Sequence, residues 1–151
     1  MRSDALLLFV ARGFGTGLVP RAPGTAGSLL GIPLYWGLLQ SGWPPLAQAL
    51  ALVVFVAVSC VIAGRAEELI GKHDSGEIVI DEIAGMAVAL FAHEPTLLNI
   101  AVIFALFRFF DIVKIWPANL IDRRMPGGRG VVLDDVVSGL YASLLAWGIG
   151  F

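Results

Sequence analysis

Apolar runs joined by short polar connections dominate this chain and limit the folds that it can adopt. Hydrophobic residues make up 58% of the sequence and charged residues 15%, with a mean hydropathy of +0.85. This is more apolar than a usual soluble domain. We predict an all-α fold, a compact multi-helix bundle embedded in a membrane, with one domain over residues 1–151. The expected helices cover residues 29–39, 46–63, 77–92, 96–115 and 136–151.

The connections between these runs differ in charge. All ten Lys and Arg lie within residues 1–28, 64–82 and 108–135, whereas the turns at 41–45 and 93–95 hold none. If every run crosses the bilayer, the three charged regions share one side, and the positive-inside rule makes that side cytoplasmic. Since some runs are near or below the minimum length for a span, a bundle set partly into one leaflet is the alternative.

The acidic stretch at residues 73–85 reads H-D-S-G-E-I-V-I-D-E-I-A-G. On a helix, Asp74, Glu77 and Asp81 would fall within about 60° of one another and share a face. Asp74 and Glu77 could instead form a capping box at a helix start. Asp81 and Glu82 stand next to apolar residues, so they require a cation, a partner or a proton.

Two further polar clusters follow at the ends of expected helices. Arg108, Asp111 and Lys114 lie at successive turns, either as functional groups or as an ion pair with a lysine at a favourable helix end. Asp134 and Asp135 open the last helix, either as functional groups or as an N-cap and a first-turn acid.

Residues 13–28 are rich in glycine, proline and small hydroxyl side chains, which predicts an irregular loop. Its backbone N–H groups and hydroxyls could bind an anion, although it lacks the Lys-Ser/Thr ending of a nucleotide P-loop. Residues 116–130 form a second polar segment containing glycine. Cys60 is the single cysteine, so no thiolate metal cage is available. The net charge of −2 and the lack of a basic stripe argue against nucleic acid as a partner.

Eight of the twelve acidic residues fall in two connections that would share a membrane face: 74, 77, 81, 82, 111, 122, 134 and 135. Hard oxygen ligands suit Mg²⁺, which usually combines a few carboxylates with waters and substrate phosphate. Neighbouring Arg and Lys favour a phosphoryl group as the anion. The residues alone therefore predict a membrane-embedded site for a metal ion and a phosphate.

Four blocks of the sequence resemble the phosphatidylglycerophosphatase A family of bacterial membrane lipid phosphatases: residues 13–29, 73–86, 107–117 and 122–139. The resemblance implies a Mg²⁺-dependent enzyme that hydrolyses phosphatidylglycerophosphate to phosphatidylglycerol and inorganic phosphate in phospholipid biosynthesis. It also implies a multi-pass protein of the bacterial inner membrane, with its active site on the cytoplasmic side. The family's usual Lys-Pro-x-Pro is here K-I-W-P, with Ile115 in place of a proline.

The residues and the resemblance together predict three groups of site residues. The catalytic group is Asp81, Glu82, Arg108, Asp111, Lys114 and Asp135. The metal ligands are expected among Asp74, Asp81, Glu82, Asp122, Asp134 and Asp135. The substrate-binding group is Gly15, Thr16, Pro23, Gly24, Thr25, Ser28, Arg123, Gly127 and Gly128.

Two other functions fit parts of the pattern. A small ion or proton transporter would use carboxylates in apolar helices, but these charges gather at helix ends and no inverted repeat is visible. A non-catalytic scaffold for anionic lipids would need basic residues and would be opposed by the acidic surplus. Metal-dependent phosphate release separates the enzyme from both. The pattern carries no prediction of oligomeric state.

Overall fold

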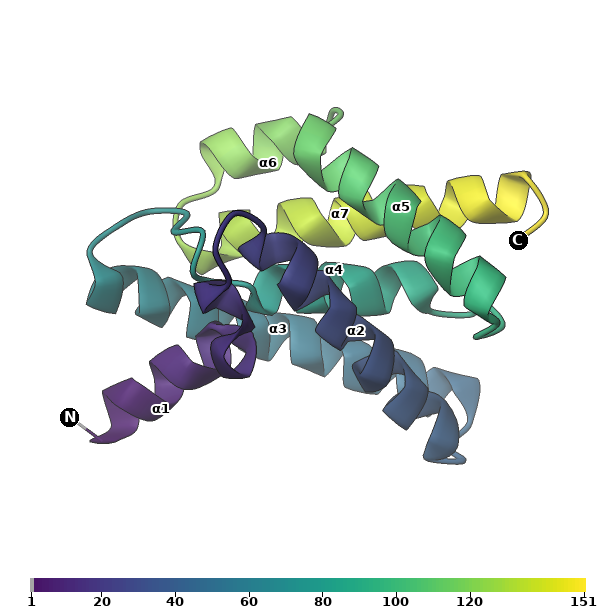
Figure 1. The fold of residues 1–151 in the computed structure, drawn as a ribbon, viewed down its shortest axis with the longest axis horizontal. Helices are drawn as coiled ribbons and strands as arrows, with labels where there is room; N and C mark the ends of the chain where they lie inside the picture. The colour runs from purple at the N-terminus through teal and green to yellow at the C-terminus, as the bar shows by residue number, and fades with distance from the viewer. Residues whose placement is uncertain (1) are drawn as a thin grey trace.

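The computed structural model describes residues 2–151, and among these it contains helices and no strand, which confirms the all-α prediction. Figure 1 shows the elements in a compact bundle. They are α1 (Arg2–Ala11), the 3-10 helix η1 (Gly13–Leu18), α2 (Pro23–Gln40), α3 (Pro45–Ile70), α4 (Ile80–Leu90), α5 (Leu97–Val113), α6 (Ala118–Arg124) and α7 (Gly128–Gly148).

The short helix α4 lies at the centre of the bundle and packs chiefly against α7 and α2, with α3 also in contact (Figure 1). Glycines bring α4 and α7 very close together. A Cβ added at Gly139 would lie 2.3 Å from the Gly85 carbonyl oxygen, and one at Gly85 would lie 2.7 Å from the Asp135 carbonyl oxygen. The close approach brings the acidic residues of the two helices together.

Two apolar clusters form the core around this helix pair. One gathers Met86 and Leu90 of α4 with Phe107 of α5, all fully buried. The other joins Ala84 of α4 to Val132 of α7 and to alanines of α3. Because each fully buried large apolar side chain contributes about 1.5–3 kcal/mol, these clusters hold α4 and α7 firmly in register.

Two helices, α3 and α7, are long and apolar enough to cross a membrane by length and composition. In its most apolar window α3 is only 17% buried inside the protein, whereas α7 is 50% buried. Helix α4 has 11 residues and is about 16 Å long, too short for a hydrocarbon core of about 30 Å. The premise that every apolar run crosses is therefore wrong for this segment.

The structure corrects the predicted loop at 13–28. Residues 13–18 form η1, and α2 begins at Pro23, so its first turns fall inside the expected loop. Proline is well suited to the first position of a helix because its missing N–H has no partner there. The glycines that suggested a loop instead allow close packing, since a Cβ at Gly27 would lie 2.6 Å from the Val79 side chain.

The last helix begins at Gly128 instead of at residue 136. Asp134 and Asp135 therefore lie inside α7, and the N-cap alternative for them is wrong. A Cβ at Gly128 would lie 2.2 Å from the Cys60 carbonyl oxygen of α3. Gly128 therefore allows α7 to cross α3 at close range. In the sequence it stands in a polar, glycine-containing segment, which suggested a loop. Within the same segment, residues 118–124 form α6.

Helix α4 begins at Ile80, three residues later than predicted, so Asp74 and Glu77 form neither a capping box nor a shared helical face with Asp81. Glu77 instead pairs with Arg12, and the distance from Arg12 Nη2 to Glu77 Oε2 is 2.5 Å. The backbone N–H of Val79 donates to the Ala11 carbonyl at 2.9 Å. These contacts tie the end of α1 to the segment that leads into α4.

Candidate active site

Three carboxylates from two helices form the centre of the site. Asp81 and Glu82 stand in the first turn of α4, and Asp135 lies in α7. One carboxylate oxygen from each lies within 4.8 Å of the others. Asp81 Oδ1, Glu82 Oε2 and Asp135 Oδ2 are buried and have no hydrogen-bond partner among the described residues. Unpartnered buried carboxylate oxygens are costly, so the cluster needs a cation or protons.

Protonation is one way in which the free protein meets this need. Burial raises the pKa of Asp81 well above its ordinary value, and the adjacent charge of Glu82 raises it further. Burial, with a contribution from the Asp111 charge, raises the pKa of Glu82 to about 7. Near neutral pH the α4 carboxylates therefore hold a proton more readily than exposed carboxylates do.

The same cluster fits a divalent cation. Its three donors are hard oxygens from two helices, one oxygen of each residue lies close to the other two, and neither thiolate nor imidazole is among them. A bound cation would offset the negative charge that these three carboxylates bring together.

Two basic side chains face the carboxylates across a cavity of about 260 Å³. Arg108 donates to Asp111 Oδ2 at 2.5 Å and to Ser28 Oγ at 3.3 Å. Lys114 Nζ lies 2.6 Å from Asp134 Oδ2 and 3.0 Å from Asp122 Oδ1.

The two lysine contacts fix the charge of this side chain. Burial lowers the pKa of Lys114, but the hydrogen bonds and charges of Asp134 and Asp122 outweigh it and leave the pKa above its ordinary value. Lys114 is therefore a fixed positive charge at the wall of the cavity.

The first turn of α2 closes one side of the site. A Cβ at Gly24 would lie 2.3 Å from Glu82 Oε1 and 3.2 Å from the Arg108 guanidinium nitrogens. The first backbone hydrogen bond of this helix is donated by Ala26 to the Ala22 carbonyl. The N–H groups of Gly24 and Thr25 thus remain without an intrahelical acceptor beside Arg108, and such helix starts attract anions.

The structure brings together most of the residues predicted from the sequence. The cavity is lined by Asp74, Asp81, Glu82, Arg108, Asp111, Lys114, Asp134 and Asp135. Asp122 reaches this group through Lys114, and Ser28 reaches it through Arg108. Pro23 and Thr25 flank Gly24 in the first turn of α2.

Other predicted residues lie apart from the cavity. The Thr16 hydroxyl donates within its own segment to the Gly13 carbonyl at 2.9 Å, and a Cβ at Gly15 would meet no atom within 4 Å. Arg123 is exposed in α6. Gly128 lies against α3, with Gly127 just before it. Their substrate-binding role stays a prediction.

Glu67 is a buried acid whose position the sequence did not reveal. Its Oε1 accepts a hydrogen bond from the Asp74 backbone N–H at 2.7 Å and lies 2.6 Å from His73 Nδ1. The Glu67 side chain is 8% exposed, whereas that of Glu68 is 64% exposed. Glu67 therefore anchors the segment that carries Asp74 to the rim of the site. The sequence pattern does not distinguish Glu67 from the adjacent Glu68. Only the fold shows which of the two side chains points into the protein.

Comparison with known proteins identifies the family of this chain. The model of the family described as "PgpA: Phosphatidylglycerophosphatase A" matches residues 9–149. The phosphatidylglycerophosphatase A of Escherichia coli K12 is 34% identical over 142 residues, covering 93% of this chain and 81% of that protein. The phosphatidylglycerophosphatase A of Haemophilus influenzae is 36% identical over 147 residues, covering 94% and 87%.

A third relative carries a different name. A Bacteroides thetaiotaomicron protein named "Putative phosphatidylinositol-3-phosphatase" is 35% identical over 159 residues, covering 99% of both chains. None of the solved structures matches this chain significantly. The family match covers nearly the whole chain, including every residue of the acidic cluster. This chain therefore belongs to the phosphatidylglycerophosphatase A family of phosphatases.

Proposed function

We propose that this protein is a Mg²⁺-dependent phosphatase that hydrolyses phosphatidylglycerophosphate to phosphatidylglycerol and inorganic phosphate in phospholipid biosynthesis. The observation that carries the proposal is the convergence of three carboxylates, each with one buried oxygen that lacks a hydrogen-bond partner, opposite Arg108 and Lys114 in one cavity. The substrate follows from the names of the two relatives that are phosphatidylglycerophosphatases A.

Asp81, Glu82 and Asp135 would hold the metal, which fits their oxygen donors and their lack of other partners. A bound Mg²⁺ would supply Lewis-acid polarisation of the phosphoryl group. Asp134 and Asp122 are engaged by Lys114, so we assign them the task of fixing that lysine. Asp74 lines the cavity from the loop before α4.

Arg108 and the start of α2 would bind the non-bridging oxygens of the phosphate. The arginine is oriented by Asp111 and Ser28, and its guanidinium lies beside the free N–H groups of the α2 first turn. Lys114 would add a second positive charge. Such pre-oriented donors stabilise the charge that spreads over the phosphoryl oxygens in the transition state.

The hydrolysis needs a proton acceptor for the attacking water. Asp111 is engaged by Arg108, whereas the Asp74 side chain is exposed at the cavity rim and forms no hydrogen bond or ion pair with another described residue. We propose that Asp74 accepts the water proton as the oxygen attacks phosphorus. The bond from phosphorus to the lipid glycerol oxygen then breaks, and that oxygen takes a proton as it leaves.

The lipid substrate places the protein at a membrane. We propose that α3 and α7 enter the bilayer of the bacterial inner membrane and that the site opens to the cytoplasmic side. The apolar exposed face of α3 supports its entry into the bilayer. Arg108 and Lys114 at the site favour the cytoplasmic side, where basic residues concentrate. The substrate headgroup would then enter the cavity while its acyl chains stay in the leaflet.

Phosphate release from phosphatidylglycerophosphate in detergent micelles tests this function, with Mg²⁺ and with excess chelator. We expect phosphate release with Mg²⁺ and none with chelator. Asp81→Asn and Asp135→Asn should lose this release, while their circular dichroism spectra stay the same as that of the wild type. Folded protein that releases no phosphate with any divalent metal would contradict it. Ion flux into liposomes from the same preparation would then favour a transporter.

A further inference from the structure

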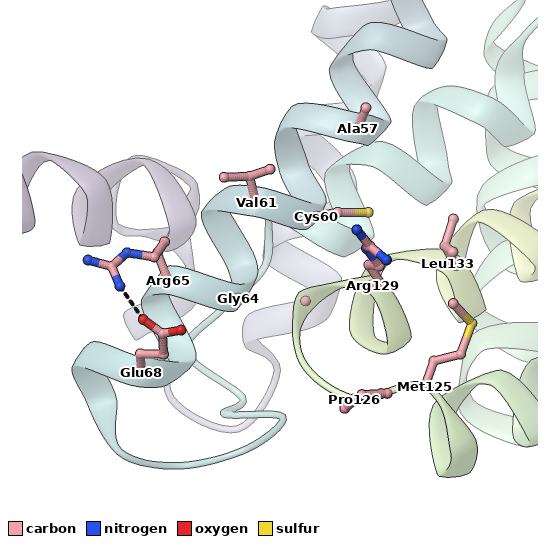
Figure 2. A pocket seen from close by; sticks show the side chains of 11 residues that line it. Ala57, Cys60, Val61, Gly64, Arg65, Glu68, Met125, Pro126, Arg129 and Leu133 are labelled. Carbon is pink, nitrogen blue, oxygen red and sulfur yellow. Dashed lines mark hydrogen bonds and ion pairs between the residues drawn. The ribbon is translucent and has the colours of Figure 1, made fainter.

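A cavity separate from the active site lies between α3 and the start of α7 (Figure 2). Its volume is about 660 Å³, within the range of about 300–1,000 Å³ typical of small-molecule sites. We call it the α3–α7 groove. Its lining residues are Ala57, Cys60, Val61, Gly64, Arg65, Glu68, Met125, Pro126, Gly128, Arg129 and Leu133.

The α3–α7 groove and the active-site cavity have no lining residue in common. On α7, Arg129 and Leu133 lie about 40° apart, and Asp135 lies about 160° round the helix from Leu133. The Gly64–Gly128 crossing closes the space between α3 and α7, with a Cβ at Gly128 only 2.3 Å from the Gly64 nitrogen. A molecule in the groove would therefore not occupy the active site.

The mouth of the groove carries a net positive charge. Arg65 pairs with Glu68, as the dashed line in Figure 2 shows. Arg129 is exposed and forms no ion pair with any residue from 2 to 151, and its guanidinium lies beside Cys60 (Figure 2). One guanidinium thus remains available to an anion.

The walls of the groove are apolar and continue onto the exposed face of α3. Val61 lines the groove and is 67% exposed, and Val54 and Val58 extend the apolar strip toward the middle of the helix. This is the helix whose apolar window is least buried inside the protein. Long apolar chains lying along this strip would reach a headgroup held by Arg129.

We propose that the α3–α7 groove binds a membrane phospholipid with an anionic headgroup, separate from the substrate site. Arg129 would pair with the phosphodiester, and the acyl chains would lie against Val61 and the apolar face of α3. The single unpaired guanidinium matches a headgroup of one negative charge, and a basic residue at the membrane surface favours such lipids. The inference rests on the membrane placement of α3 and is independent of phosphatase activity.

Cys60 is a built-in reporter because it is the only cysteine of the chain and lines the groove. The full chain is reconstituted in phosphatidylcholine vesicles with or without one third phosphatidylglycerol, and the rate of maleimide labelling is measured. Phosphatidylglycerol should slow labelling of Cys60 at least about twofold. A bound lipid would cover the thiol, so a site that is half occupied would halve the labelling rate.

Three variants separate this site from general surface attraction. Arg129→Gln should abolish the slowing by phosphatidylglycerol, Arg129→Lys should largely retain it, and Arg124→Gln should leave it unchanged. Equal labelling rates in both vesicle types would overturn the proposal. Slowing that persists in Arg129→Gln would also overturn it, because the effect would then come from vesicle charge. Neither result depends on phosphate release, so failure here is distinct from failure of the proposed enzyme.

Discussion

The α4–α7 contact at Gly139 makes the metal site sensitive to a single methyl group. In Gly139→Ala the new Cβ would stand 2.3 Å from the Gly85 carbonyl oxygen, whereas ordinary contact begins near 3.4 Å. The helices must separate by about 1 Å to relieve the overlap, at a cost of about 1–3 kcal/mol. Some of this cost is offset by the gain of up to about 1 kcal/mol from alanine in a helix.

The same displacement moves Asp135 away from Asp81 and Glu82. Each Mg²⁺ ligand lies about 2.1 Å from the ion, so two ligands of one ion are at most about 4.2 Å apart. The three carboxylate oxygens lie within 4.8 Å of one another, which is close to this limit. A small inward movement of the side chains would let them share one ion, whereas a further separation of the helices by about 1 Å would oppose it. We expect the Mg²⁺ concentration for half-maximal phosphate release to rise at least about tenfold, a loss of about 1.4 kcal/mol in binding.

The assay is phosphate release from phosphatidylglycerophosphate micelles over a Mg²⁺ titration, with thermal unfolding measured on the same samples. Gly148→Ala is the matched control, because it makes the same change in α7 where a Cβ meets no atom within 4 Å. A Gly139→Ala protein with the Mg²⁺ dependence and stability of the Gly148→Ala protein would refute the link between helix contact and metal site.

Three other predictions follow from single contacts. In Glu67→Gln the buried group that accepts from His73 and from the Asp74 backbone loses its charge. Thermal unfolding should show that the free energy of unfolding falls by about 1–3 kcal/mol. The exposed Glu68→Gln is the control and should show almost no loss. Arg108→Lys should lower kcat/KM for phosphate release by about 10²–10³ because one forked donor is lost, and unchanged kinetics would remove Arg108 from the site. With chelator present, the free energy of unfolding should fall as pH rises from about 4.5 to about 7, since burial raises the pKa of Asp81 and Glu82 and the folded state holds their protons more tightly than the unfolded chain does. Glu82→Gln should reduce this slope without abolishing it, and denaturant titrations of the wild type that are flat over this range would contradict the prediction.

The sequence predicts the all-α class, the chemistry of the acidic residues and the family, because these depend on composition and on local motifs. The expected helix at 96–115 corresponds to α5, and the structure adds that Thr96 is its N-cap, with its side chain accepting from the Asn99 N–H at 3.1 Å. The sequence predicts Asp81 and Glu82 as site residues because carboxylates next to apolar residues are costly without a partner. It predicts Asp135 from the grouping of acidic residues and from the family resemblance.

The glycines misled the prediction of helix boundaries. Gly24, Gly27 and Gly128 lie inside helices, where they allow another chain segment to pass within a few ångströms. A glycine that serves such a crossing has the same local pattern as a glycine in a loop, so only tertiary contacts separate them. The same limit explains why Glu67 was missed, since its partners lie in the loop that the fold brings back over α3.

The most direct test of the central claim is divalent metal binding across α4 and α7, measured by the electron paramagnetic resonance of Mn²⁺ titrated into the detergent-solubilised protein. We predict saturable binding by the wild type, loss of at least about tenfold in affinity in Asp81→Asn and Asp135→Asn, and retention in Asp122→Asn, whose carboxylate contacts Lys114 outside the cluster. Wild-type affinity in Asp135→Asn, or loss in Asp122→Asn alone, would contradict the account and move the metal site elsewhere.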